Sequence, residues 1–376
     1  MKRYIIIAAA ALLAVSCAKH YDVSTTSERS IGFGTWTENL TKAHDPSGTA
    51  FGEGDTFNVY GHKTISSAST PVFEGTVVTK GASAWTYAPT RFWDPSASTY
   101  TFFAVAPAGL VSTATQSSGA YTGAITSGNV EFLGGDTDKG DIKDVLVAAK
   151  KEVAQADFGS DVNLVFYHIA SLLDLKVQKH NDLELSGEDS NNYIKVEVTS
   201  VSLTNIDGNG TFSISTYGDS DPYAPVLSAS TWTANTSAAK KTYNQTSGYE
   251  TVTLPNDVNA VSASSPNALI SKLVVMPQSF RTAETDHSSD QTVNIAYTIT
   301  TCEGGQTSST NYTAAFDLKE FDNARDYSND SDNYIASWAP GTHYTYIITI
   351  GANAITFTAQ IQTWAEEVSG YHYIIN

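Results

Sequence analysis

Acidic side chains gather at two points of the 376-residue chain where they could bind a cation. Asp136-Thr137-Asp138-Lys139-Gly140-Asp141 places three carboxylates within six residues, and its spacing begins like that of a calcium loop. A calcium loop ends in a bidentate acid, which is missing here, and Lys139 weakens the local negative charge. A solvated hairpin loop is the simpler interpretation, and it also fits Asn329-Asp330-Ser331-Asp332-Asn333. We therefore predict no metal ligands in either loop.

Side chains that perform catalysis do not gather anywhere in the sequence. The eight histidines are scattered, and His168 lies in an apolar stretch, where a core imidazole bonded to the backbone is expected. The sequence contains no HExxH, no GxSxG and no phosphate-binding glycine loop. We predict neither an enzyme nor a cofactor. The six Trp and twenty Tyr could stack on sugars, but most of them lie at strand positions, where packing explains them.

Cys17 is the residue most suited to covalent modification, because it follows an export signal. Met1-Lys2-Arg3 is basic, and Tyr4 to Val15 is an unbroken apolar run. A helix needs about 20 apolar residues to span a bilayer, so this run has the length of a secretory signal instead. Leu13-Ala14-Val15-Ser16-Cys17 is similar to a bacterial lipobox, although Ala14 stands where Leu is usual. We predict lipidation of Cys17, which would tether the exported chain to a membrane; an ordinary signal peptide is the alternative.

Cys302 is the other cysteine of the chain. If Cys17 carries lipid, Cys302 has no partner and no intramolecular disulfide can form. The stretch Thr301-Cys302-Glu303-Gly304-Gly305 is typical of a strand that ends in a turn. A buried, inert thiol is therefore expected there, and the stability of the protein must come from packing.

Composition limits the classes of partner. A formal net charge of −18 argues against nucleic acid and against polybasic binding to anionic lipid. An apolar share of 41% and an aromatic share of 11% are sufficient for real hydrophobic cores. The length corresponds to about two domains after removal of the signal.

Alternation of apolar and polar residues predicts strands along most of the chain. No βαβ rhythm is present, and turn residues separate the strands, which favours antiparallel sandwiches. The predicted strands are 31–36, 55–60, 72–79, 85–87, 100–107, 129–133, 145–149, 162–177, 194–205, 211–215, 249–254, 269–276, 293–300, 312–318, 344–350 and 355–364.

We predict an all-β fold of two tandem antiparallel β-sandwich domains, Greek-key and transthyretin-like, after the signal peptide. Lys150 to Ser160 is weakly helical or a loop, and the domain boundary is expected there. The predicted divisions are a signal peptide (1–16), a tether with a first strand (17–42), an N-terminal sandwich (43–155) and a C-terminal sandwich (156–376).

The order of several short motifs resembles the fimbrillin family of Bacteroidales, the lipoprotein precursors of the FimA and Mfa type that build surface pili. The resemblance extends over nearly the whole chain, and each motif is weak alone. The motifs are Phe51–Tyr60, Trp93-Asp94-Pro95, Tyr100–Pro107, Val162–Ser171, Met276-Pro277-Gln278 and Trp338–Tyr346.

The resemblance implies a mechanism of assembly. In such precursors an early strand completes the N-terminal sandwich until a trypsin-like protease cuts behind it. The groove that this strand leaves then accepts a C-terminal strand of the next subunit, and the head-to-tail contact does not close. Mapped onto this sequence, Ile31, Phe33 and Trp36 would point inward from the removable strand.

Lys42 is the expected processing site, because Thr41-Lys42-Ala43 stands where relatives carry Thr-Arg-Ala. An arginine-specific protease would not cut there. Either a lysine-tolerant protease acts, or the subunit stays uncut as an anchor or terminator, or Lys42 is an ordinary loop lysine. Arg29 is the alternative site, but a cut there would leave the strand in its groove.

Two C-terminal segments are candidate donor strands. The first is 355–364, with Ile355, Phe357, Ile361 and Trp364 on one side or at its end. The second is the tail 371–376, which alternates through Tyr371, Tyr373 and Ile375 and could leave its domain easily. The first segment could instead complete the C-terminal sandwich.

We therefore expect a structural subunit, shaft or tip, of a cell-surface fimbria that supports adhesion. Its partners would be other fimbrial subunits, outer-membrane lipid through Cys17 before processing, and ligands on host or bacterial surfaces. The rival interpretation is a lipid-anchored glycan-binding protein, and an extracellular hydrolase has no residue set to support it.

Overall fold

The structure is a computed structural model in which the regular elements are almost entirely strands. It describes residues 30–35, 51–111, 113–117, 120–125, 144–183, 185–214, 217–218, 221–225, 232–235, 237–245, 268–280, 290–320, 322–323, 335–352 and 355–363. Short 3-10 turns occur at Gln155–Asp157, Asn181–Leu183 and Leu318–Glu320. Among these residues no helix is long and apolar enough to cross a membrane. The predicted all-β sandwich class is confirmed.

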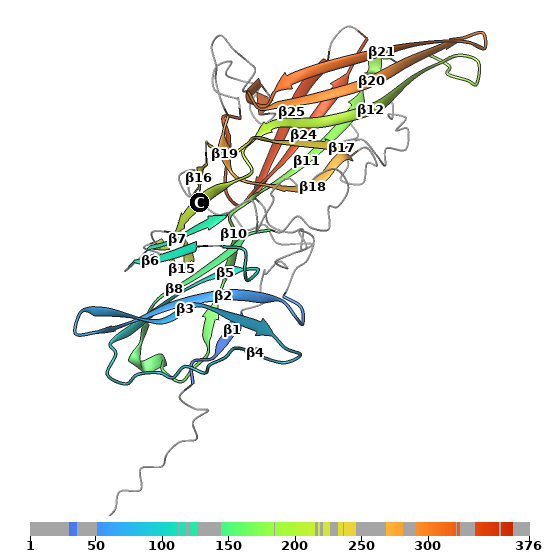
Figure 1. Cartoon of the computed structure of the whole chain (residues 1–376). Coiled ribbons are helices and arrows are strands. Elements are labelled where there is room, and N and C mark those ends of the chain that lie inside the picture. Colours follow the sequence, from blue (N-terminus) through green and yellow to red (C-terminus); the bar gives the residue numbers. More distant parts are fainter. Residues whose placement is uncertain are drawn as a thin grey trace, which may run out of the picture.

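A six-stranded sheet forms the frame of the N-terminal half, in the order β10-β8-β5-β2-β3-β4. Figure 1 shows β2, β3, β4, β5 and β8 in the lower part of the molecule and β10 nearer its middle. The strands are β2 (Thr56–Ile65), β3 (Ala68–Lys80), β4 (Trp85–Thr86), β5 (Thr99–Ala106), β8 (Leu146–Ala154) and β10 (Phe166–His168).

Strand β5 is buried on both faces, which explains why its sequence is a continuous apolar run. Phe102 and Ala104 belong to an N-terminal core, whereas Phe103 and Val105 belong to a second core that continues into the C-terminal half. A strand covered on both sides needs apolar residues at every position. The two halves of the protein therefore share one buried cluster across this sheet.

A four-stranded sheet joins segments from both halves of the sequence, in the order β16-β13-β7-β6. Its members are β6 (Thr113–Ser117), β7 (Ala120–Ile125), β13 (Gly210–Ile214) and β16 (Trp232–Ala234). The indole nitrogen of Trp232 donates to the carbonyl of Ile169 at 2.5 Å, so this sheet is tied to the start of the C-terminal half. The hairpin of β14 (Tyr217–Gly218) and β15 (Asp221–Pro225) lies beside it, against β8.

Two sheets form the C-terminal sandwich. The first has the order β18-β11-β24-β25-β22 and the second β17-β12-β20-β21. The strands of the first are β11 (Ser171–Lys179), β18 (Ala268–Val275), β22 (Asp322–Asn323), β24 (Thr342–Ile350) and β25 (Ile355–Thr363). Those of the second are β12 (Tyr193–Ile206), β17 (Lys241–Gln245), β20 (Thr292–Glu303) and β21 (Gln306–Asp317).

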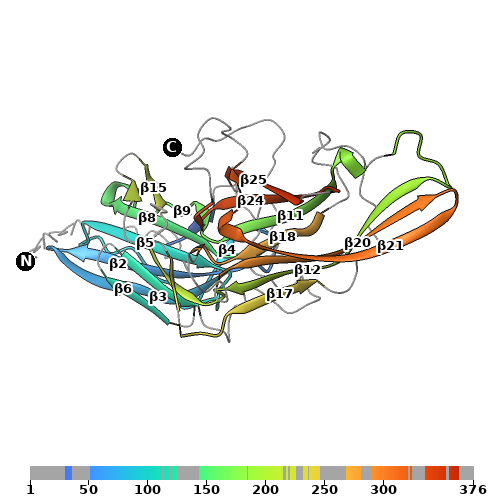
Figure 2. The ribbon, with the colours of Figure 1, turned by 90° about the horizontal axis from the view of Figure 1, so that it is seen from above.

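The long strands β12, β20 and β21 extend as a ribbon away from the rest of the molecule (Figures 1 and 2). Buried and partly exposed residues alternate along the first half of β20, and the second half is mainly partly exposed or exposed, with Cys302 buried. This half-buried alternation is what a strand with one face on the core requires. A short pair, β19 (Gln278–Ser279) with β23 (Ser337–Trp338), closes one end of the sandwich.

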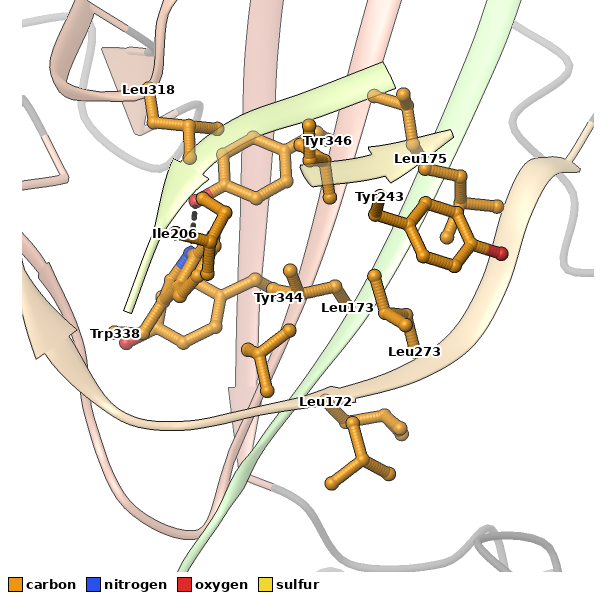
Figure 3. Packing of buried hydrophobic residues seen from close by; sticks show 14 of the residues in the cluster. Leu172, Leu173, Leu175, Ile206, Tyr243, Leu273, Leu318, Trp338, Tyr344 and Tyr346 are labelled. Atoms are coloured by element: carbon orange, nitrogen blue, oxygen red, sulfur yellow. Dashed lines mark hydrogen bonds between the residues drawn. The ribbon is translucent and has the colours of Figure 1, made fainter. Parts of the chain in front are cut away.

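The core of the C-terminal sandwich is built around the aromatic side chains of Trp338, Tyr344 and Tyr346 (Figure 3). The indole nitrogen of Trp338 donates to the hydroxyl of Tyr346 at 2.7 Å. The hydroxyl of Tyr344 accepts from the Ala339 amide at 2.8 Å and donates to the Ser337 carbonyl at 3.2 Å. The Trp338–Tyr346 motif therefore serves packing: its rings fill the core and their polar ends satisfy the turn that precedes β24.

Parallel pairing departs from the antiparallel expectation. Strand β11 pairs with β24 in parallel over nine residues, from Ser171 opposite Thr342 to Lys179 opposite Ile350. Two shorter parallel pairs join β1 (Phe33–Thr35) to β9 (Val162–Leu164) and β22 to β25. Such partners lie far apart in the sequence, and no hairpin turn announces them.

The chain returns to the N-terminal half after the expected boundary at residue 155. Strand β8 continues to Ala154, β9 pairs with β1, and β10 pairs with β8. Val162, Leu164 and Phe166 lie in the N-terminal core. The predicted strand 162–177 is thus three strands, and pairing with the N-terminal sheets extends to His168. The predicted strands 129–133 and 249–254 lie outside the described residues.

Candidate functional site around the first strand

The predicted first strand is a short edge element that contributes large side chains to the N-terminal core. Ile31 is 1% exposed and Phe33 is 5% exposed. The ring centroid of Phe33 lies 5.5 Å from that of Phe73 and 5.6 Å from that of Tyr87, with Phe57 and Phe102 slightly farther away. The strand is therefore neither loose in solvent nor threaded through the middle of a sheet.

Backbone contacts hold β1 at few points. The Ile31 amide donates to the Arg91 carbonyl at 2.9 Å, and the Val162 amide donates to the Gly32 carbonyl at 2.8 Å. The parallel pairing with β9 extends over three residues. Because parallel pairs are slightly weaker per residue than antiparallel ones, the backbone contributes little compared with the two buried side chains.

Tyr87 fastens the beginning of this strand. Its hydroxyl donates to the Ile31 carbonyl at 2.6 Å, and its ring packs edge-on against Phe33. Partial burial raises the pKa of Tyr87, with the Arg91 backbone and charge opposing the shift. The phenol therefore remains a neutral donor at every physiological pH.

The opposite face of this segment carries two glycines, Gly32 just before β1 and Gly34 within it, beneath the polar side chains of Asp161 and Asn163. Gly34 pairs with Asn163 in the ladder. A β-carbon at Gly32 would lie 1.9 Å from Asp161 Oδ1, and one at Gly34 would lie 2.5 Å from Asn163 Oδ1. Asp161 and Asn163 are themselves exposed. The strand thus has a bulky inner face and an outer face with no side chain at these two positions.

The segment 31–35 lies outside the six-stranded sheet and, among the described strands, pairs with β9 alone. It lies at an edge, is short, and carries two large inward side chains, Ile31 and Phe33. Its departure would expose the apolar surface around Phe57, Phe73 and Val162, together with the unpaired backbone of β9.

Several predicted residues of the processing machinery lie outside the described residues. These are Cys17, Arg29, Trp36 and Lys42. Among the donor candidates, Ile355, Phe357 and Ile361 belong to β25, whereas Trp364, Tyr371, Tyr373 and Ile375 lie outside the described residues. The structure thus brings together the first strand and its groove, but it leaves the cleavage segment and the tail undescribed.

Strand β25 lies within the C-terminal sheet. It pairs antiparallel with β24 over nine residues, from Ile355 opposite Ile350 to Thr363 opposite Thr342. On its other side it pairs with β22 over two residues only. The predicted hairpin of 344–350 with 355–364 is therefore confirmed as a ladder, and most of the outer edge of β25 has no partner among the described strands.

His168 forms a buried pair with a carboxylate, a partner that the sequence did not indicate. Its Nδ1 lies 2.5 Å from Asp144 Oδ2, and both side chains are buried at the junction between the halves. Cys302 is a buried free thiol that donates to the Asn191 carbonyl at 3.2 Å. Among the described residues no three His, Cys, Asp or Glu side chains converge as metal ligands; both acidic loops lie outside them.

Three residues at this site escaped the sequence analysis: Tyr87, Asp161 and Asn163. Tyr87 had been assigned to a predicted strand without a role, and the other two follow the expected domain boundary. The roles of Asp161 and Asn163 arise from pairing between segments about 130 residues apart, and Tyr87 reaches Ile31 across 56 residues. Alternation within any of these segments contains no signal for such contacts.

Comparison with known proteins identifies the family. A family model described as fimbrillin-like matches residues 41–364. The chain belongs to the fimbrillin-like family. A comparison with curated proteins finds no match.

Fimbrial proteins are among the solved structures that match this fimbrillin-like chain, and the first of those named below shares its fold. A fimbrial protein from Bacteroides vulgatus is 19% identical with a TM-score of 0.53, and the match covers 90% of this chain and 100% of that one. A fimbrilin (FimA) from Porphyromonas gingivalis is 10% identical with a TM-score of 0.40, over 89% and 97% of the two chains. The tip fimbrial protein Mfa3 of the same organism, truncated at its C-terminus, is 10% identical with a TM-score of 0.35, over 86% and 97%.

Proposed function

We propose that this fimbrillin-like protein is a structural subunit, shaft or tip, of a cell-surface fimbria and that it polymerises by strand exchange. The observation that carries the proposal is the first strand, whose buried Ile31 and Phe33 belong to a short edge element. A subunit that loses this strand presents an apolar groove beside unpaired backbone, which is the acceptor for β-augmentation. The role is one of assembly rather than catalysis.

The energy of exchange comes from refilling the groove. Burial of a large aliphatic or aromatic side chain contributes roughly 1.5–3 kcal/mol, so the vacated sites of Ile31 and Phe33 alone favour reoccupation by several kcal/mol. Longer pairing by an incoming strand would add to this. An exchanged joint is therefore stronger than the three-residue pair it replaces, and it needs no disulfide.

The incoming strand is proposed to come from the C-terminal region of another copy. The sequence Ile-x-Phe occurs at two places in the chain, Ile31-Gly32-Phe33 and Ile355-Thr356-Phe357. This likeness supports 355–364 as a donor that could place the same two side chains in the same two sites. The tail 371–376 remains the second candidate, since its release would not break the nine-residue ladder of β25 with β24.

Release of the first strand requires a cut between it and β2. Lys42 lies on this connection, and Arg29 precedes the strand. We therefore propose Lys42 as the processing site. A cut at Arg29 would free the chain from a lipid at Cys17 and leave the groove occupied.

The test is controlled proteolysis of the chain that begins at residue 18. Brief trypsin treatment should release a fragment ending at Lys42, and SDS-resistant ladders should follow. Lys42→Ala should abolish both, whereas Arg29→Ala should leave the ladder unchanged. Deletion of 371–376 without loss of the ladder would exclude the tail as donor, and a monomer that persists after complete cutting would contradict strand exchange.

Export and anchoring are proposed to precede assembly. Lipidation at Cys17 would hold the precursor at the outer membrane, facing outward, until the protease separates the mature subunit from its tether. Growth of cells with an alkyne-tagged palmitate should label the wild-type precursor and should not label Cys17→Ser. Equal labelling of the two would exclude this cysteine.

Glycan binding is the alternative function, and one feature of the ribbon favours it. Tyr312 is 41% exposed on β21 and stacks on Tyr297 with ring centroids 5.3 Å apart. An exposed, ordered ring can stack on a sugar. A glycan array probed with the uncut chain should give hits that Tyr312→Ala removes if this alternative holds, and no hits if the protein serves only as a subunit.

A further inference from the structure

An added β-carbon at position 32 or 34 would meet a neighbouring side chain, while the backbone conformation there does not itself call for glycine. Neither residue has the positive φ that favours glycine elsewhere in the described chain. What excludes a side chain is the position of the Asp161 carboxylate over Gly32 and of the Asn163 amide over Gly34, at 1.9 Å and 2.5 Å from an added β-carbon.

The geometry of parallel pairing fixes this opposition. Phe33 faces Val162 and Gly34 faces Asn163 in the register, and side chains on neighbouring strands alternate together between the two faces. Val162 and Leu164 are therefore directed into the core with Ile31 and Phe33, whereas Asp161 and Asn163 are exposed on the other face. Any strand that replaces β1 in this register therefore places one residue opposite Asp161, where Gly32 lies now, and one opposite Asn163, where Gly34 lies now.

The C-terminal candidates carry side chains at all such positions. Neither 355–364 nor 371–376 contains a glycine. If Ile355 and Phe357 take the places of Ile31 and Phe33, then Thr356 and Thr358 stand opposite Asp161 and Asn163. The neighbour's strand can therefore enter only after both polar side chains have turned away.

We propose that Asp161 and Asn163 act as a steric selector that favours the chain's own glycine-bearing strand and resists entry of a neighbour's strand. The proposal rests on the proposed function, since it concerns the same groove. Both side chains are exposed, so they can turn into solvent without burying a charge, and the selector is a barrier rather than a block. The selector favours the first strand in the uncut chain. It restricts exchange to strands whose other contacts outweigh the cost of displacing the Asp161 and Asn163 side chains.

The direct test measures which peptide the groove prefers. In the chain that begins at residue 18, a site for a highly specific protease replaces 37–43, and the folded protein is cut there. Two fluorescent peptides then compete for the groove: 30–36 as it stands, and the same peptide with Gly32→Ala and Gly34→Ala. Without a selector the alanine peptide should bind better, because it loses less conformational entropy.

We expect the cut wild-type protein to bind the glycine peptide at least about tenfold more tightly, the factor that displacement of two side chains from their rotamers would produce. The double variant D161G/N163G should reverse this preference. The matched control D161N/N163D keeps both shapes and the net charge, and it should retain the wild-type ratio. If the ratio of the affinities for the glycine and alanine peptides is the same in wild type and in D161G/N163G, the selector proposal is overturned. Failure of both peptides to exchange in either protein overturns the strand-exchange function itself.

A second measurement needs no exchange and uses the intact chain from residue 18. Gly32→Ala should lower the Tm in the wild-type background and should leave it unchanged or raise it in the Asp161→Gly background. In the Asp161→Asn background the loss should persist, because the shape of residue 161 is kept. If Gly32→Ala changes the Tm equally in all three backgrounds, Asp161 does not exclude a side chain at this position.

Discussion

Two parallel strand pairs, β1 with β9 and β11 with β24, show how the same type of contact serves opposite purposes. The first pair extends over three residues at the edge of the N-terminal core. The second extends over nine residues and lies inside a sheet, with β18 on one side and β25 on the other. Both join segments far apart in sequence, so both close large loops.

The difference lies in length, in neighbours and in side chains. Strand β24 is buried along seven consecutive residues and shares its rings with the C-terminal core. Strand β1 has two large buried side chains separated by glycine. Removal of β24 would dismantle a sandwich, whereas removal of β1 would open a groove in one that keeps its frame. The segment proposed to detach is thus one whose two large side chains, Ile31 and Phe33, lie on a single face.

The largest expected effect is that of Tyr346→Ala in β24. Loss of this fully buried ring should lower the free energy of unfolding by about 3–5 kcal/mol, measured by urea denaturation. Tyr346→Phe keeps the ring and leaves the Trp338 indole N–H without its acceptor, so a smaller loss of about 1–3 kcal/mol is expected. A loss below about 1 kcal/mol for the alanine variant would mean that β24 contributes no more to global stability than the short edge strand β1.

Phe33→Ala should have a smaller and more local effect. The burial of this ring is worth about 1.5–3 kcal/mol. If β1 leaves alone, as proposed, the loss cannot exceed the free energy that docks β1. Hydrogen exchange should accelerate at the Ile31 and Val162 amides, which bond across this site, while the β24 amides keep their protection. Acceleration throughout the molecule would show that β1 and β24 unfold together.

High pH should weaken the parallel pair of β11 with β24 more than the parallel pair of β1 with β9. Burial raises the pKa of Tyr346 well above its ordinary value near 10. Above pH 10 the unfolded tyrosine ionises and the folded one does not, so stability is complete below pH 10 and falls by up to about 1.4 kcal/mol per pH unit above it. In urea denaturation between pH 9 and 11, Tyr346→Phe should make the unfolding free energy depend less steeply on pH. Part of the dependence should remain, because burial also raises the pKa of Tyr344. If the pH dependence of the unfolding free energy is unchanged in Tyr346→Phe, the loss of stability at high pH comes from other tyrosines.

The smallest effect is expected for Tyr87→Phe. This change removes the hydroxyl that donates to the Ile31 carbonyl and keeps the ring against Phe33, so a loss of about 0.5–1.5 kcal/mol is expected. Exchange of the Ile31 amide should accelerate, and peptide exchange into the cut chain should become faster. Tyr312→Phe, at an exposed ring, is the control and should change neither. Unaltered exchange in Tyr87→Phe would remove Tyr87 from the attachment of the first strand.

Local sequence reasoning succeeded where a single strand determines its own environment. The alternation of 55–60 and 293–300 predicted half-buried strands, and the continuous apolar run of 100–107 corresponds to a strand buried on both faces. Gly351 and its neighbours predicted the turn between β24 and β25, which pair as a hairpin. Ile31 and Phe33, which the family resemblance placed on the inner side of the first strand, are buried.

What the sequence could not determine is which distant strands become neighbours. The chain by itself determines its strands, its turns and the face that each strand buries, because these depend on the period of side chains along a few residues. Only the tertiary structure decided that β9 returns to the first strand, that β13 joins β7, and that Asp161 and Asn163 lie over two glycines. The physical reason is that the pairing and register of distant strands are selected by the fit of whole buried surfaces, to which no single segment contributes enough to reveal its partner.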